Sequence, residues 1–84
     1  MKRRTIVLTE SSDLNDCTDI YAMYRIDAGI APPINSPGVG FSVYPIETAW
    51  GTFQIAIYYG ENTSIMFRNY FNGNWGDWET ILTS

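Results

Sequence analysis

Residues 53–78 read FQIAIYYGENTSIMFRNYFNGNWGDW, and this stretch decides the fold. Two runs within it, residues 53–59 and 64–71, are rich in the β-branched and aromatic residues that favour strands, and their apolar residues recur at every second position. The segment between the runs contains Asn62, a residue that tolerates the left-handed backbone of a tight loop. The stretch therefore predicts an antiparallel β-hairpin.

The alternation also predicts the register of this hairpin. Side chains two residues apart share a face of the sheet, so only some registers bring the two apolar faces together. A loop at residues 60–62 does so by pairing Ile57 with Ile65 and Ile55 with Phe67. The face expected to pack into the core carries Phe53, Ile55, Ile57, Tyr59, Ile65, Phe67 and Phe71.

Asn72 and Gly73 predict a second hairpin, because both residues accept the positive φ of a type I′ turn. This turn would place Trp78 in the core and leave a charged pair on the outside. Cross-strand pairs of this kind each contribute roughly 0.2–1 kcal/mol. The expected partners are Tyr70 with Trp75, Arg68 with Asp77, and Phe67 with Trp78.

The rest of the chain carries shorter signals. Residues 5–9, 20–26 and 39–44 are typical of strands, and Pro45 is expected to end the last of them. Residues 31–38 contain three prolines, which lack the N–H that a helix or a strand ladder requires. We expect this segment to be an ordered surface loop.

The predicted fold class is mainly β: a small antiparallel meander or sandwich-like domain of about five or six short strands. Ser and Asp side chains near residues 12–17 can cap one helical turn. Residues 1–10 are expected to form an extended arm and residues 11–84 a single knob-like domain. With one cysteine, Cys17, no intrachain disulfide can stabilise the chain, so an aromatic core or self-association must do so.

The charge distribution excludes several classes of partner. Nine acidic residues oppose five basic ones, and three of the five lie together at residues 2–4. No basic stripe is present to neutralise phosphates, which argues against a nucleic-acid partner. The apolar run at residues 6–8 is too short for a signal peptide, and no stretch approaches the ~20 apolar residues of a membrane helix.

The sequence also lacks the usual chemistry of an enzyme. It contains no histidine, and Cys17 lies in an acidic turn that would raise its pKa. We expect no catalytic residue, no metal ligands and no cofactor. A glycoside hydrolase needs only two carboxylates and is the enzymatic rival, but the acidic residues fit caps, turns and solvated strand faces.

An aromatic surplus remains after these exclusions. Several aromatic residues fall on loops or on the outward phase of the expected strands, beside amides and carboxylates. Such rings cover the apolar face of a sugar while amides bond its hydroxyls, and the same residues would serve a subunit interface. The candidates for a ligand site or an interface are Trp50, Tyr58, Tyr70, Asn74 and Trp75.

The order of these features resembles the pyocin-knob module of bacteriophage and R-type pyocin tail fibres, over roughly residues 11–82. The resemblance begins at Asp13-Leu14-Asn15, continues through the tyrosine strand at residues 21–26 and Val39-Gly40-Phe41, and includes Phe53-Gln54-Ile55 and Phe67-Arg68. Its most specific part is the ending, Asn72-Gly73-Asn74-Trp75-Gly76-Asp77-Trp78. By this resemblance Leu14, Arg68 and Trp78 are structural framework positions.

The resemblance implies a non-catalytic virion protein, made in the bacterial cytoplasm without a signal peptide. It implies a homotrimer that contributes to binding of a host-surface glycan or receptor, with residues 2–8 as an attachment to other virion proteins. The alternative is a purely structural assembly or decoration protein with no ligand. Fibre proteins carry a shaft before the knob, so the chain is either an excised fragment or a module that works alone.

Overall fold

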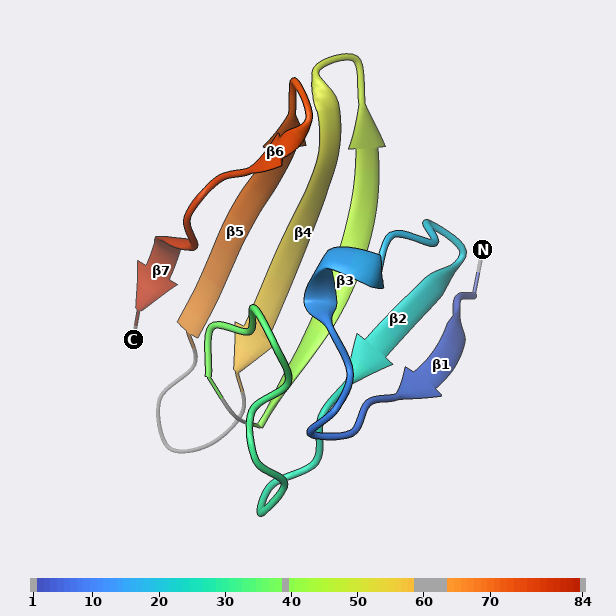
Figure 1. Ribbon diagram of the computed structural model, residues 1–84, viewed down its shortest axis with the longest axis vertical. Helices are drawn as coiled ribbons and strands as arrows, with labels where there is room; N and C mark the ends of the chain where they lie inside the picture. The colour runs from blue at the N-terminus through green and yellow to red at the C-terminus, as the bar shows by residue number, and fades with distance from the viewer. Residues whose placement is uncertain (1, 39, 59–63, 84) are drawn as a thin grey trace.

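The computed structural model describes residues 2–38, 40–58 and 64–83, which form one seven-stranded sheet and a single 3-10 turn (Figure 1). The predicted mainly β fold is confirmed, and the turn lies within the expected range. The elements are β1 (Arg4–Val7), η1 (Leu14–Asp16), β2 (Ala22–Arg25), β3 (Phe41–Thr48), β4 (Gly51–Tyr58), β5 (Ser64–Phe71), β6 (Asn74–Trp75) and β7 (Glu79–Thr83).

The sheet is largely the expected antiparallel meander. β2, β3, β4 and β5 follow one another as antiparallel neighbours, and the short strands β6 and β7 both pair with β5. β1 pairs with β2 in parallel and so forms one edge of the sheet. Part of the segment expected as an arm is therefore a strand, and Leu8, which follows it, is buried in the core.

The hairpin of β4 and β5 has the predicted register. Ile57 pairs with Ile65 and Ile55 with Phe67, and β5 begins and ends where the sequence predicted. The loop expected at residues 60–62 lies outside the described residues.

Pro45 does not end β3, contrary to expectation: the strand continues to Thr48 and pairs with β4 along its whole length. β2 pairs with β3 only at Val43 and Ser42, so Pro45 lies beyond the last β2 partner. A proline is tolerated where one side of the strand needs no ladder hydrogen bond.

The core lies on the opposite side of the sheet from the one expected. η1 and the loop that contains residues 26–38 lie in front of the sheet in Figure 1, and they cover the face of Phe41, Val43 and Ala56. The buried core consists of Leu8, Leu14, Cys17, Ala22, Tyr24, Ile26, Phe41, Val43 and Ala56.

The other face, called the outer face below, is the one that the alternation predicted to be buried. Its apolar residues are half-buried, except that Ile46 and Phe71 are exposed, and Ser42 on this face is buried. The reversal follows from the docking of η1, because Gln54 on the covered side of β4 donates to the carbonyls of Leu14 and Cys17. By register the outer face carries Tyr44, Ile46, Phe53, Ile55, Ile57, Ile65 and Phe67.

The second hairpin forms at the predicted turn, where Asn72 and Gly73 have φ of 56° and 86°. Tyr70 pairs with Trp75 as expected. The chain then shifts register, because Phe67 pairs with Glu79 in β7.

The predicted pair of Phe67 with Trp78 is therefore wrong, and Arg68 and Asp77 form neither a ladder pair nor an ion pair. The Gly76 amide still donates to the Asn69 carbonyl in the first register. One extra residue then separates this register from that of β7, so both Asp77 and Trp78 lie opposite Arg68. A shift of one residue moves a side chain to the other face, which puts Trp78 beside Arg68 and not beside Phe67.

Candidate functional site

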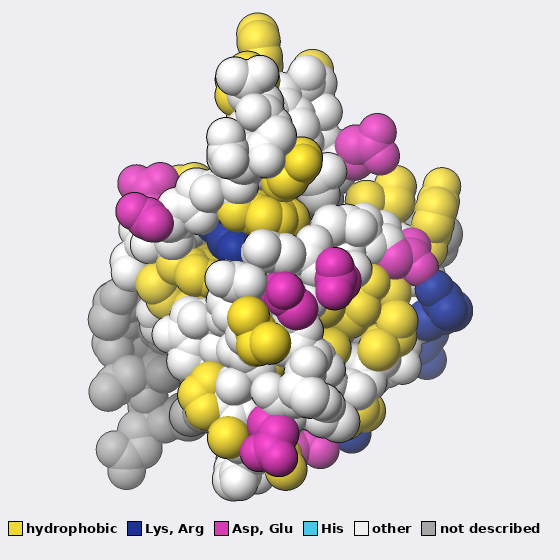
Figure 2. Space-filling model, viewed as in Figure 1, with side chains coloured by type: hydrophobic (Ala, Val, Ile, Leu, Met, Phe, Trp, Pro, Cys, Tyr) yellow, Lys and Arg dark blue, Asp and Glu magenta, His cyan; other side chains and the backbone are white. Residues whose placement is uncertain are grey.

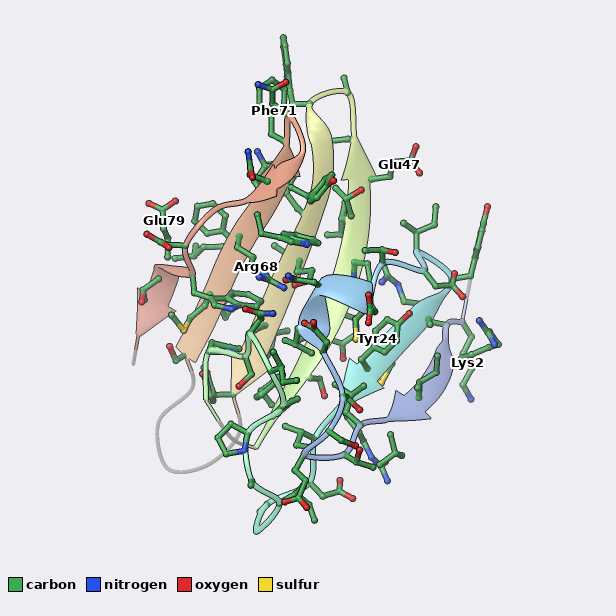
Figure 3. The ribbon with its side chains drawn as sticks, viewed as in Figure 1. Lys2, Tyr24, Glu47, Arg68, Phe71 and Glu79 are labelled. Atoms are coloured by element: carbon green, nitrogen blue, oxygen red, sulfur yellow. The ribbon has the colours of Figure 1, made fainter. Side chains whose placement is uncertain are left out.

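A buried polar chain connects η1 to the middle of the sheet. Gln54 is fully buried, and its Nε2 donates to the carbonyls of Leu14 and Cys17 at 2.6 and 2.9 Å. Its Oε1 accepts a 2.7 Å hydrogen bond from Nε of Arg68 on the neighbouring strand. Gln54 thus fixes both the turn above the sheet and the head group of Arg68, the residue labelled near the middle of the sheet in Figure 3.

Arg68 lies between two tryptophans. Its guanidinium carbon is 4.1 Å from the ring centroid of Trp75 and 4.9 Å from that of Trp78. The register shift after Gly76 makes this arrangement, because it turns Trp78 to the same side as Trp75. Cation–π contacts of desolvated groups are worth about 2 kcal/mol, so the stack holds both rings in place.

The charge on Arg68 has no carboxylate partner within ion-pair distance among the described residues. Burial lowers the pKa of the guanidinium to about 10, and the nearby Asp13 charge opposes that effect. The group therefore remains protonated at neutral pH. Its Nη2 is buried and has no hydrogen-bond partner among the described residues.

Asn35 joins the loop above the sheet to the same stack. Its carbonyl accepts a 3.0 Å hydrogen bond from Nε1 of Trp78, and its Nδ2 donates to Asp13 at 2.7 Å. Asp13 also accepts from the amide of Asn15 and so caps η1. These two hydrogen bonds lower the pKa of Asp13, the one from Asn35 most.

The stack borders an open pocket of about 570 Å³ between the β5–β6 hairpin, η1 and the residue 35–36 loop. In Figure 2, where Lys and Arg are dark blue, a dark blue patch lies between hydrophobic side chains below this hairpin. Among the residues that line the pocket, Arg68 is the basic one. The rings of Tyr70 and Trp75 meet edge to face, with centroids 5.2 Å apart. The lining residues are Asn15, Asn35, Ser36, Arg68, Tyr70, Gly73, Asn74, Trp75, Gly76, Asp77 and Trp78.

The structure brings together three of the five candidate residues. Tyr70, Asn74 and Trp75 line the pocket together. Trp50 lies apart from them in the turn between β3 and β4, with 72% of its surface exposed.

Tyr58 does not point outward as expected. It pairs with Phe41, meets that ring edge to face at 5.9 Å and packs against the core.

The residues assigned to a framework by resemblance are connected in space. Leu14 is fully buried, and its carbonyl accepts from Gln54, which in turn holds Arg68. Trp78 packs on Arg68 and against the core. Two of these three residues, Arg68 and Trp78, also line the pocket.

Sequence reasoning missed the amide residues Asn15, Asn35 and Gln54. Gln54 alternates with Ala56 on the less apolar face of its strand, which suggested the solvent side. Asn35 lies in a proline-rich loop and has a φ of 62°. Asparagine tolerates this left-handed conformation, but nothing in the neighbouring sequence predicts it.

The described residues contain no cluster of three or more His, Cys, Asp or Glu side chains that could hold a metal ion, and their helical segment is too short to cross a membrane. Cys17 is buried, and burial with the nearby Asp16 and Asp13 charges raises its pKa to about 11. No family model, curated protein or solved structure matches the chain.

Proposed function

We propose that this chain is a non-catalytic recognition module that binds a bacterial surface glycan in the pocket beside the Trp75–Arg68–Trp78 stack. The observation that carries the proposal is the placement of aromatic rings next to amide side chains in one open hollow. Tyr70 and Trp75 offer ring surface, while Asn74, Asn35 and Asn15 offer donors and acceptors.

The pocket suits a sugar for physical reasons. An aromatic ring covers the apolar C–H face of a pyranose, and amides and carboxylates bond its hydroxyls. Because Arg68 holds Trp75 in place before a ligand arrives, little side-chain entropy is lost on binding. The volume of about 570 Å³ accommodates a sugar unit with part of its neighbour.

The setting that we propose is a phage or phage-derived particle, in which the module forms a tail-fibre-like knob. The resemblance of residues 11–82 to the pyocin-knob module supports this setting. The exposed basic residues Lys2 and Arg4 at the edge of the sheet offer an attachment to other virion proteins.

The alternative is a structural assembly protein without a ligand. The apolar outer face favours it, because such a face serves contacts between proteins and gives no hydrogen bonds to a sugar.

Binding to a glycan array separates the two functions. We expect the wild-type chain to bind a subset of bacterial glycans and Trp75→Ala to lose that binding about tenfold, because an aromatic contact contributes up to about 1.5 kcal/mol beyond the area that it buries and ~1.4 kcal/mol is a factor of ten. Trp50→Ala is the matched control, because it removes the same kind of ring at a place outside the pocket. If the wild-type chain binds no glycan, or if Trp75→Ala and Trp50→Ala bind glycans equally well, the proposed site is wrong.

A further inference from the structure

The outer face of the sheet is an apolar surface without a second layer among the described residues. η1 and the loop segments pack on the other face (Figure 1). At the centre of the outer face the rings of Phe53 and Phe67 stack, with their centroids 6.2 Å apart. Ile55 is the residue of β4 that pairs with Phe67. Large exposed apolar patches of monomeric proteins mark sites of interaction.

The size of this face fits a contact between folded domains. Three outward positions take up six residues of a strand, or about 20 Å, and the neighbouring strands β2, β3, β4, β5 and β7 together take up roughly 24 Å. The projected area is therefore about 500 Å², the same order as the ~800 Å² of accessible surface that each partner contributes to a stable interface.

The outer face is one side of a β-sheet, so another sheet is a fitting partner for it. Two sheets pack face to face about 10 Å apart, with their apolar side chains interleaved. The central positions of the outer face carry no charged side chain on β3, β4 or β5, as the registers show for the three described strands. A partner with the same apolar centre would bury it without leaving a charge unpaired.

The charges at the edges indicate which sheet that partner is. Arg25 shares the outer face with Ser42 on the β2 side, and the Arg3 guanidinium lies over the Tyr44 ring at 5.6 Å. On the opposite side Glu79 pairs with Phe67 and shares its face. Figure 3 shows Lys2 and Glu79 at opposite edges of the molecule. The Lys2 edge also carries the ion pairs Arg4–Asp19 and Arg25–Asp27, and with Lys2 and Arg3 it keeps an excess of basic residues, whereas the other edge carries an acidic group.

A two-fold axis that runs along the strands would place the basic edge of one copy over Glu79 of the other. The same rotation would stack the apolar centre on itself. In such an isologous contact each pairing occurs twice, which makes the face complementary to itself.

We infer that the outer face is a self-association surface on which a second copy of this chain packs sheet to sheet about a two-fold axis. This contact uses none of the residues that line the pocket, so both pockets stay open in the assembled pair. The inference does not depend on what the pocket binds.

Sedimentation equilibrium from low micromolar to near-millimolar concentration tests the contact. We expect the wild-type chain to dimerise and Ile55→Lys to raise the dissociation constant at least a hundredfold, because two charges would be buried in the apolar centre. Ile34→Lys is the matched control: Ile34 is 54% exposed on a loop away from the outer face, and its substitution should leave dimerisation unchanged.

A charge exchange keeps the test valid if Ile55→Lys fails to fold. Glu79 and Arg25 are exposed, and the Arg25–Asp27 pair at 3.2 Å lies on the surface, where ion pairs contribute little, so neither substitution should disturb the fold. Glu79→Arg alone should weaken the dimer roughly tenfold, since it replaces attraction by repulsion at two symmetric places. Adding Arg25→Glu should restore most of the affinity.

Three results would overturn the inference. They are a chain that stays monomeric over the whole range, a dimer or trimer that Ile55→Lys leaves intact while the fold is kept, and a double variant that is weaker than either single one.

Discussion

Arg68 donates from Nε to Oε1 of Gln54 at 2.7 Å, and both side chains are almost completely buried. This hydrogen bond joins two adjacent strands on the covered side of the sheet and ends a polar chain that begins at the carbonyls of Leu14 and Cys17. Its position between the core and the pocket makes it the contact through which folding and site geometry depend on each other.

Gln54→Leu should destabilise the protein by about 3 kcal/mol, because the carbonyls of Leu14 and Cys17 and the Nε of Arg68 all lose a buried partner. Urea unfolding measures this loss. Asn74→Leu is the control, since Asn74 is an exposed amide.

The double variant Gln54→Leu with Arg68→Met should be less destabilised than the sum of the two single variants, by about 1–2 kcal/mol. Removing both partners of a buried hydrogen bond leaves fewer unsatisfied groups than removing one. Additive losses would show that the two side chains are not coupled.

Asp13→Asn should lower stability at neutral pH and flatten its fall in acid. The hydrogen bonds from Asn35 and the Asn15 amide lower the pKa of Asp13 below its ordinary 3.8. A lowered pKa means that the stabilising effect is present above the unfolded value and is lost as the pH falls through the folded one. Thermal unfolding between pH 7 and pH 2 measures the curve. Asp16→Asn, in the same turn, should keep the wild-type shape; an unchanged curve for Asp13→Asn would contradict the assignment.

The Cys17 thiol should react with a disulfide reagent at least a hundredfold more slowly in the folded protein than in guanidinium-unfolded protein at pH 8. The side chain is 4% exposed, so the reagent has little access to the sulfur. Its pKa is raised to about 11, so only a small fraction of the thiol is the reactive thiolate at pH 8. Absorbance of the released thiol follows the reaction. Equal rates in the two states would show that the segment containing η1 does not cover the sheet.

Alanine at three glycines should give three different outcomes in unfolding experiments. Gly51→Ala should be the most harmful, because its Cβ would lie 2.2 Å from the Tyr70 carbonyl oxygen at a φ of 125°. Gly73→Ala meets no atom within 4 Å but keeps a φ of 86°, so we expect a loss of about 1 kcal/mol.

Gly76→Ala is the contrasting case, since its Cβ would make an ordinary 3.6 Å contact with the Asn69 carbonyl. Its effect should lie within about 0.5 kcal/mol of zero. A loss at Gly76 as large as that at Gly51 would mean that the chain between β6 and β7 is more constrained than the backbone angles indicate.

The strands and their pairing were largely predictable because both depend on local patterns. Alternation of Phe53, Ile55 and Ile57 sets the register with β5, and the Asn72–Gly73 turn sets the pairing of Tyr70 with Trp75. These features need no knowledge of the rest of the fold.

Which face is covered was not predictable in the same way. Burial depends on where η1 docks, and that choice rests on Gln54 reaching two carbonyls that lie 40 and 37 residues away in sequence. The pocket depends on it too: Tyr70, Asn74 and Trp75 were found as candidates, whereas Asn15 and Asn35 come from segments that the fold alone brings near. The apolar composition of the Phe53 face predicted that this face is buried, whereas long-range hydrogen bonds hold η1 on the opposite face.

The extra residue between β6 and β7 has a consequence for how this sequence can vary. Deleting Asp77 would remove the bulge and leave the following tryptophan opposite Arg68 and Glu79 opposite Phe67, in the register of the Asn72–Gly73 hairpin. Continuing that register with all residues in place would instead send Trp78 to the side of Phe67, so that the pocket would lose one wall and the outer face would gain a ring. The bulge in this segment therefore decides on which side of the sheet this tryptophan lies.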